Sequence, residues 1–93
     1  MAAQVIFTTK ARQALLDIAG HIALDNEAAA FRLVADLEKR VADTLSLFPE
    51  AGPKTEGGQR VLTVRQHSVV YRFDAVKGEV LVLDIFGPGM DWR

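Results

Sequence analysis

Apolar and polar residues alternate along the chain with two different periods, which predict strands in some stretches and helices in others. Residues 69–73 (VVYRF) are β-branched or aromatic and predict the central strand of a small sheet. The runs at 60–64 and 80–86 have the same character and predict strands on either side of it. A fourth β-prone run, residues 4–8, stands near the start of the chain.

Between the first run and the later three, the apolar period becomes that of a helix. Leu15, Ile18 and Ile22 are spaced by three and four, so they share one face of a first helix, which Thr8 or Thr9 caps. Asn26 caps a second, longer helix, which ends before Pro49. We expect its apolar stripe to pack between the helices and the sheet; the stripe consists of Phe31, Val34, Leu37, Val41, Leu45 and Phe48.

Alternation in the last two strands predicts which side chains face the helices. One face becomes wholly apolar if a hairpin with a loop at residues 75–79 pairs Phe73 with Leu81, Tyr71 with Leu83 and Val69 with Ile85. The opposite face then carries Val70, Arg72 and Val82, with Arg72 diagonal to Asp84 and near enough for a charge pair. Apolar area around one arginine is typical of a surface that a protein partner covers, although exposed valines are also common in strands.

The order of elements is strand, helix, helix, strand, strand, strand, which predicts the α+β class. We expect an N-terminal strand and an antiparallel two-helix hairpin packed on a three-stranded antiparallel meander. The 93 residues suit a single domain, residues 1–93. Residues 49–58 contain two prolines and three glycines and are interpreted as a loop within that domain.

Composition and charge exclude several kinds of site. The net charge of −1 argues against a long nucleic-acid footprint, but not against a local basic face. Without cysteine there is no disulfide or thiolate zinc site, and two histidines are too few for a histidine-rich metal site, so we expect no metal or cofactor. No apolar run approaches the roughly 20 residues that span a bilayer, and no secretory signal is visible, so we expect a soluble, cytoplasmic protein.

Several short motifs, in order, resemble the ParE/RelE superfamily of bacterial toxin–antitoxin toxins. Residues 9–19 (TKARQALLDIA) resemble the family's first helix, and residues 47–52 (LFPEAG) resemble its helix exit. Val64-Arg65 followed by residues 69–73 resembles its two-strand signature, and residues 85–92 (IFGPGMDW) resemble a ParE ending. The likeness extends over essentially the whole chain, and it implies the same fold and the toxin role of a type II toxin–antitoxin system.

Two activities occur on that scaffold. RelE-type members cut messenger RNA on the ribosome with Lys, Arg, His, Glu and Tyr side chains around the sheet and the tail. Here those positions are occupied by residues 61–64 (VLTV) and 87–91 (GPGMD), which leaves His67, expected to be a solvated turn residue, as the one proton-transfer candidate. ParE-type members are similar in poisoning DNA gyrase by binding, so the resemblance implies a gyrase inhibitor that is not an enzyme.

The resemblance also implies a ParD-like antitoxin whose disordered tail folds on the toxin. We expect that contact at Leu16, Ile22 and Leu24 of the first helix and at Val70, Arg72 and Val82 of the outer sheet face. The expected contacts with gyrase are Arg60, Arg65, Arg72, Met90, Asp91, Trp92 and Arg93. The alternatives are a solvated sheet rim for the arginines and packing of the tail on the helices for Trp92.

Residues 87–89 (GPG) replace the basic residue that usually precedes a ParE ending. A weakened or non-toxic ParE-like binding module is therefore one alternative to the gyrase inhibitor. A ribosome-dependent endonuclease of RelE type, with an unusual set of residues, is another.

Overall fold

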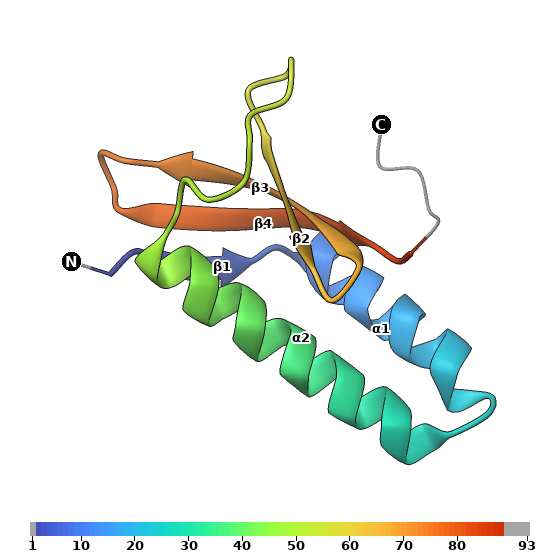
Figure 1. Cartoon of the computed structure of the whole chain (residues 1–93). Helices are drawn as coiled ribbons and strands as arrows, with labels where there is room; N and C mark the ends of the chain where they lie inside the picture. Colours follow the sequence, from blue (N-terminus) through green and yellow to red (C-terminus); the bar gives the residue numbers. More distant parts are fainter. Residues whose placement is uncertain (1, 89–93) are drawn as a thin grey trace.

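The computed structural model describes residues 2–88 and shows a four-stranded sheet covered on one face by two helices (Figure 1). The first strand, β1 (Gln4–Phe7), leads into the helical hairpin of α1 (Thr9–Ala23) and α2 (Glu27–Leu47). The chain then forms β2 (Arg60–Val64), β3 (His67–Asp74) and β4 (Glu79–Phe86). This order confirms the predicted α+β class and the RelE/ParE-like arrangement of elements.

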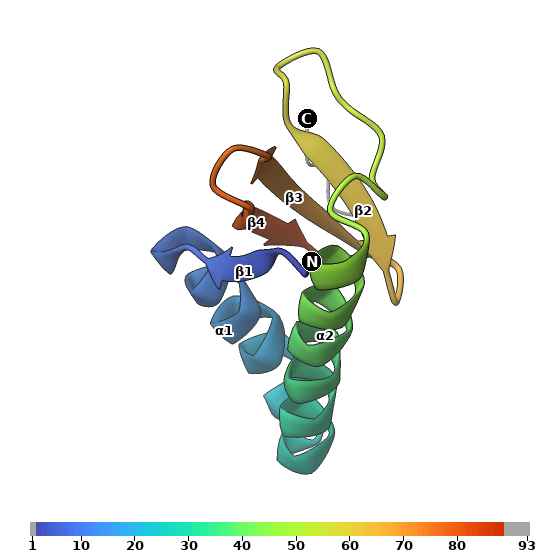
Figure 2. The ribbon, with the colours of Figure 1, turned by 90° about the vertical axis from the view of Figure 1, so that its left-hand side faces the viewer.

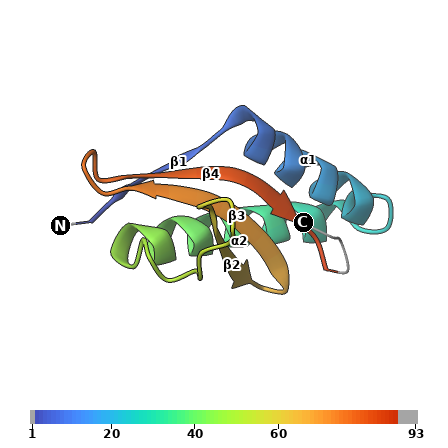
Figure 3. The same cartoon turned by 90° about the horizontal axis from the view of Figure 1, so that it is seen from above.

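The sheet has the order β1-β4-β3-β2. β2, β3 and β4 form the predicted antiparallel meander, and β1 adds to its other edge, parallel to β4. Both helices lie on the same side of the sheet, and the loop before β2 rises on the other side (Figure 2). Seen from above, α1 lies beside β1 and β4, whereas α2 runs beneath the sheet (Figure 3). The sheet therefore has an inner face toward the helices and an outer face away from them.

Two side chains start the helices at predicted positions. The Thr8 hydroxyl accepts a hydrogen bond from the backbone N–H of Ala11 at 3.2 Å and donates to the carbonyl of Val82 at 2.8 Å. Thr8 thus caps α1 and also ties its first turn to β4. The Asn26 side chain accepts from the N–H of Ala29 at 3.0 Å and caps α2. Such caps are each worth about 1 kcal/mol.

The core lies between the inner face of the sheet and the two helices. Its buried members come from five elements: Phe7, Ala11, Leu15, Leu37, Val41, Leu45, Val69, Tyr71, Val80, Val82 and Ile85. The predicted burial of the two ends of the α2 stripe is wrong, because Phe31 is 71% exposed and Phe48 is 64% exposed. The buried position in the first turns of α2 is Ala30, one residue earlier, and Phe48 lies beyond the last helical residue with a non-helical backbone.

A β-bulge changes the predicted register between β3 and β4. Val69 lies opposite Ile85 as predicted, but the pairing shifts between Val70 and Tyr71, so Tyr71 lies opposite Val82 and not Leu83. The predicted pairing of Phe73 with Leu81 is wrong for the same reason, since Phe73 faces Val80. The bulge inserts one extra residue into β4. The β4 side chains that precede it therefore lie on the opposite face of the sheet from the one that strict alternation predicts.

The hairpin loop is also one residue shorter than predicted. Asp74 pairs with Glu79, which leaves residues 75–78 as the loop. The Asp74 carboxylate accepts hydrogen bonds from the N–H groups of Val76 at 3.0 Å and Lys77 at 3.1 Å, and Gly78 supplies a positive φ of 65°. These bonds satisfy backbone N–H groups of the turn.

No helix within residues 2–88 is long and apolar enough to cross a membrane.

Candidate interaction surfaces

The outer face of the sheet carries a mixed set of apolar and polar side chains. Val70 and Arg72 lie on it as predicted; Val70 is only 6% exposed, whereas Arg72 is exposed. The predicted placement of Val82 on this face is wrong, because the bulge turns its side chain into the core, where it is fully buried. The assignment of Val82 to an antitoxin contact is wrong for the same reason. Leu81 and Leu83 lie outside the core cluster, contrary to their predicted burial beneath the helices.

Two hollows adjoin on this outer side, and both are bordered by Gln59. One, of about 480 Å³, is lined by Thr8, Lys10, Gln59, Val70, Leu83, Asp84 and Phe86. The other, of about 840 Å³, lies between the loop before β2 and the sheet and is lined by Pro53, Lys54, Thr55, Glu56, Gly57, Gln59, Val61, Thr63 and Ser68. Their linings combine aliphatic side chains with hydroxyl, amide and charged groups, which suits contact with another polypeptide.

The charge pair predicted between Arg72 and Asp84 does not form. Asp84 is instead paired with Lys10 from the first turn of α1, with 3.3 Å between Nζ and Oδ2. Arg72 lies opposite Leu81 in the register. Within residues 2–88 its guanidinium has no ion-pair partner, so its charge is available to a binding partner.

Arg60, one of the expected gyrase contacts, holds the loop before its own strand. Its Nη1 donates to the carbonyl oxygen of Gly52 at 2.9 Å and to that of Glu50 at 3.3 Å, and its side chain is 15% exposed. The buried hydroxyl of Tyr71 accepts a hydrogen bond from the N–H of Gly52 at 2.9 Å. Arg60 therefore has a structural role, and most of its guanidinium is engaged within the chain.

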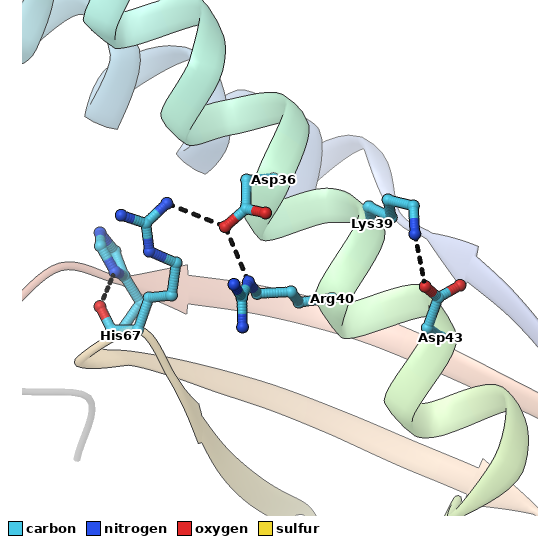
Figure 4. Close-up of polar contacts among 6 residues, drawn as sticks. Asp36, Lys39, Arg40, Asp43 and His67 are labelled. Carbon is cyan, nitrogen blue, oxygen red and sulfur yellow. Dashed lines mark hydrogen bonds and ion pairs between the residues drawn. The ribbon is translucent and has the colours of Figure 1, made fainter.

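Arg65, another expected gyrase contact, lies in the tight turn between β2 and β3. Val64 pairs with His67, so the turn consists of Arg65 and Gln66 alone. Both residues have positive φ, 48° and 66°. The Arg65 guanidinium lies 2.9 Å from the Asp36 carboxylate of α2, which also binds Arg40 at 2.8 Å (Figure 4). The hydrogen bond from Arg40 and the charges of both arginines hold the pKa of Asp36 below its ordinary value.

The expectation of a solvated turn histidine is wrong. His67 is the first residue of β3 and is 5% exposed. Its Nδ1 lies 2.8 Å from the carbonyl oxygen of Arg65, which requires the proton on Nδ1, since a carbonyl can only accept (Figure 4). His67 thus stabilises the turn, and burial restricts its access to a substrate.

The expected antitoxin contacts on and just after α1 differ in their exposure to solvent. Leu16 is 64% exposed, and Leu24, just after the helix, is 85% exposed. Ile22 is half-buried. Sequence periodicity missed a further exposed apolar side chain on the hairpin, Phe31, because its spacing also fits the buried stripe.

Met90, Asp91, Trp92 and Arg93, the remaining expected gyrase contacts, lie outside the described residues. Within residues 2–88, no group of three histidine or acidic side chains lies close enough together to hold a metal ion. The described surface thus offers exposed apolar side chains on the helical hairpin, a mixed outer sheet face and an arginine cluster around Asp36.

Comparison with known proteins agrees with this arrangement. The chain is similar in structure to a protein of the chromosomal ParDE toxin–antitoxin system of P. aeruginosa, with a TM-score of 0.78 and 26% identity over 94% of this chain and 97% of that one. It is also similar to a chain of the RelBE2 toxin–antitoxin complex of Mycobacterium tuberculosis, with a TM-score of 0.73 and 22% identity over 94% of this chain and 99% of that one.

A mutant of E. coli RelE in the free state shares the fold, with a TM-score of 0.62 and 18% identity over 94% of this chain and 84% of that one. No curated protein sequence matches the chain. A family model described as the ParE toxin of the type II toxin–antitoxin system parDE matches residues 5–92. Because this match spans nearly the whole sequence, the chain belongs to the ParE family of type II toxin–antitoxin toxins.

Proposed function

We propose that this ParE-family toxin inhibits DNA gyrase by binding it, without catalysing a reaction, and that a ParD-like antitoxin neutralises it. The observation that carries the proposal is the chemistry of the outer sheet face. Its two adjoining hollows are lined by aliphatic, hydroxyl and amide groups together with the charged Lys10, Lys54, Glu56 and Asp84, and the exposed Arg72 lies on the same face. Such a surface is suited to docking on a protein.

Cleavage of messenger RNA would require a set of catalytic groups on this face. It requires a base for the ribose hydroxyl, an acid for the leaving oxygen and cations for the phosphate. Lys10 and Asp84 are paired with each other there, and His67 is buried and bonded to the turn. This arrangement favours inhibition by binding over catalysis.

The helical hairpin supports the proposal of a neutralising partner. Leu16 and Leu24 expose most of their side chains, and exposed leucines are suited to the apolar side of a segment that folds on the toxin. The chain of the ParDE system of P. aeruginosa, from a system that contains both components, is similar over almost its whole length.

Supercoiling of relaxed plasmid by purified gyrase and ATP tests the proposal. We expect the toxin to inhibit supercoiling in a dose-dependent way and to leave topoisomerase I unaffected. Arg72→Ala is expected to weaken inhibition several-fold, because it removes an unpaired cation from the outer face. Lys77→Ala is the matched control, since it removes the same charge from the loop between β3 and β4.

Full supercoiling at a large molar excess of folded toxin would refute gyrase as the target. Translation of a messenger RNA in the presence of the toxin, followed by primer extension, is the complementary test. Codon-specific cuts would show that the toxin is a RelE-type enzyme and would overturn the non-enzymatic mechanism.

A further inference from the structure

One carboxylate, that of Asp36, holds two guanidinium groups from different parts of the fold. Arg40 lies one turn further along α2, and its Nε is 2.8 Å from Oδ2 of Asp36. Arg65 comes from the turn between β2 and β3, and its Nη1 is 2.9 Å from the same oxygen. Each guanidinium carries five N–H donors in a planar fork, so both arginines retain donors that Asp36 does not use.

The turn that carries Arg65 is strained. Both of its residues have positive φ, a conformation that costs about 1–2 kcal/mol for a residue with a Cβ and that hairpin turns usually assign to Asn-Gly. The carbonyl of Arg65 accepts from His67, and its guanidinium is bound to Asp36. These two contacts hold the strained turn in its conformation, and the turn fixes the Arg65 side chain against α2.

The cluster faces solvent and carries excess positive charge. The side chains of Arg40 and Arg65 are 60% and 45% exposed. Arg32 lies one turn before Asp36 on α2, is exposed and has no ion-pair partner within residues 2–88. Three arginines against one aspartate leave a net charge of +2.

We propose that Arg32, Arg40 and Arg65 bind the carboxylate side chains of an acidic segment of a partner protein, and that the antitoxin supplies this segment. The inference deepens the proposed function and depends on its antitoxin partner. Guanidinium forks bind carboxylates through paired hydrogen bonds.

Charge complementarity favours a protein segment over a nucleic acid. The whole chain has a net charge of −1, and the cluster extends over only two turns of α2 and one hairpin turn. Duplex DNA presents one negative charge about every 1.7 Å, and tight binding to it requires a longer basic track. A short acidic segment matches the size of this cluster.

Titration of the full chain with a synthetic helical peptide that carries glutamates along one side tests the inference. Binding is followed by NMR at low salt. We expect Arg32→Ala and Arg65→Ala each to weaken peptide binding by about fivefold. Asp36→Asn should tighten it about twofold or more, because the opposing negative charge is removed. Lys77→Ala, at the opposite end of β3, makes the same charge change and should have little effect.

Equal affinity of the peptide for the wild type, Arg32→Ala and Arg65→Ala would overturn the inference. So would weaker binding by a folded Asp36→Asn variant, since a purely structural ion pair would then be the better account. Tighter binding of a DNA duplex than of the peptide would assign the cluster to nucleic acid.

Gyrase inhibition by the same preparations separates the two proposals. Arg32→Ala should lose peptide affinity while it still inhibits supercoiling. If the wild type binds the peptide through this cluster but does not inhibit gyrase, the proposed target is refuted and the acidic-segment site stands.

Discussion

The buried hydroxyl of Tyr71 provides a direct test of how the loop between α2 and β2 is anchored. Tyr71 is fully buried in the core, and its hydroxyl accepts a hydrogen bond of 2.9 Å from the N–H of Gly52, which is also buried. The substitution Tyr71→Phe keeps the aromatic ring and deletes only this acceptor. The Gly52 N–H is then left in a site that the ring and the loop still cover.

The expected loss of stability follows from that unpaired donor. A buried donor without a partner costs about 1–3 kcal/mol. For a domain of this size, each kcal/mol lowers the melting temperature by about 4–8 °C. Tyr71→Phe should therefore melt at least about 4 °C below the wild type, and urea denaturation should give a lower midpoint with an unchanged m-value.

The same hydroxyl predicts how stability depends on alkaline pH. Burial raises the pKa of Tyr71 above the ordinary tyrosine value, because the charged phenolate is poorly solvated there. Since the folded-state pKa is the higher one, this contribution is complete below the unfolded-state pKa of about 10 and is lost as the pH rises through the folded-state pKa.

The chain has a single tyrosine, so the ultraviolet absorbance of tyrosinate reports this group alone. We expect Tyr71 to titrate above its ordinary pKa in the folded protein and at that pKa in urea, and Tyr71→Phe should remove the corresponding part of the alkaline loss of stability. Titration at the ordinary value in a protein that stays folded, together with wild-type stability of Tyr71→Phe, would refute the anchoring role.

Three further predictions concern packing and backbone conformation, and urea denaturation measures each of them. Gly52→Ala should destabilise the fold by about 1–3 kcal/mol, because an added Cβ would lie 2.7 Å from a backbone carbonyl oxygen of β2, whereas Gly57→Ala, which meets nothing within 4 Å, should change stability by less than about 0.5 kcal/mol. Leu37→Ala should cost about 2–5 kcal/mol, since Leu37 is fully buried, but Phe31→Ala less than about 0.5 kcal/mol; equal losses would contradict the observed core. Gln66→Gly should stabilise the fold by up to about 1 kcal/mol because it relieves a positive φ, and a loss of stability would show that the turn is not strained there.

The elements that the sequence predicts well are those whose signals are local. The caps at Thr8 and Asn26 depend on side chains that bond backbone N–H groups three residues away. The α2 stripe through Leu37, Val41 and Leu45 repeats with the helical period, and all three are buried. These signals, together with the strand runs, suffice for the fold class because every step depends on neighbours along the chain.

The arginine cluster could not be predicted in the same way. Asp36 and Arg65 are separated by 29 residues, and nothing in the sequence around either one points to the other. The pair of Asp36 and Arg40 is visible as an i,i+4 spacing, but that spacing alone predicts an exposed helix pair of small effect. Only the tertiary arrangement of α2 against the hairpin turn shows that two guanidinium groups share one carboxylate.

The bulge opposite Val70 explains both the wrong register and the nature of the outer face. A single extra residue in β4 cannot be read from alternation, because alternation assumes an uninterrupted ladder. It buries Val80 and Val82 and leaves Leu81 and Leu83 outside the core, which changes the residues available for binding.

The bulge also lies at a hollow. Val70 and Leu83, beside the register shift, both line the hollow of about 480 Å³ on the outer face. Bulges are frequent next to functional sites, where they redirect side chains. The expectation of a surface for a protein partner therefore remains for this face, but it depends on Leu81 and Leu83 in place of Val82. Because these leucines are larger than valine, the corrected register presents more apolar area to a partner than the alternation predicts.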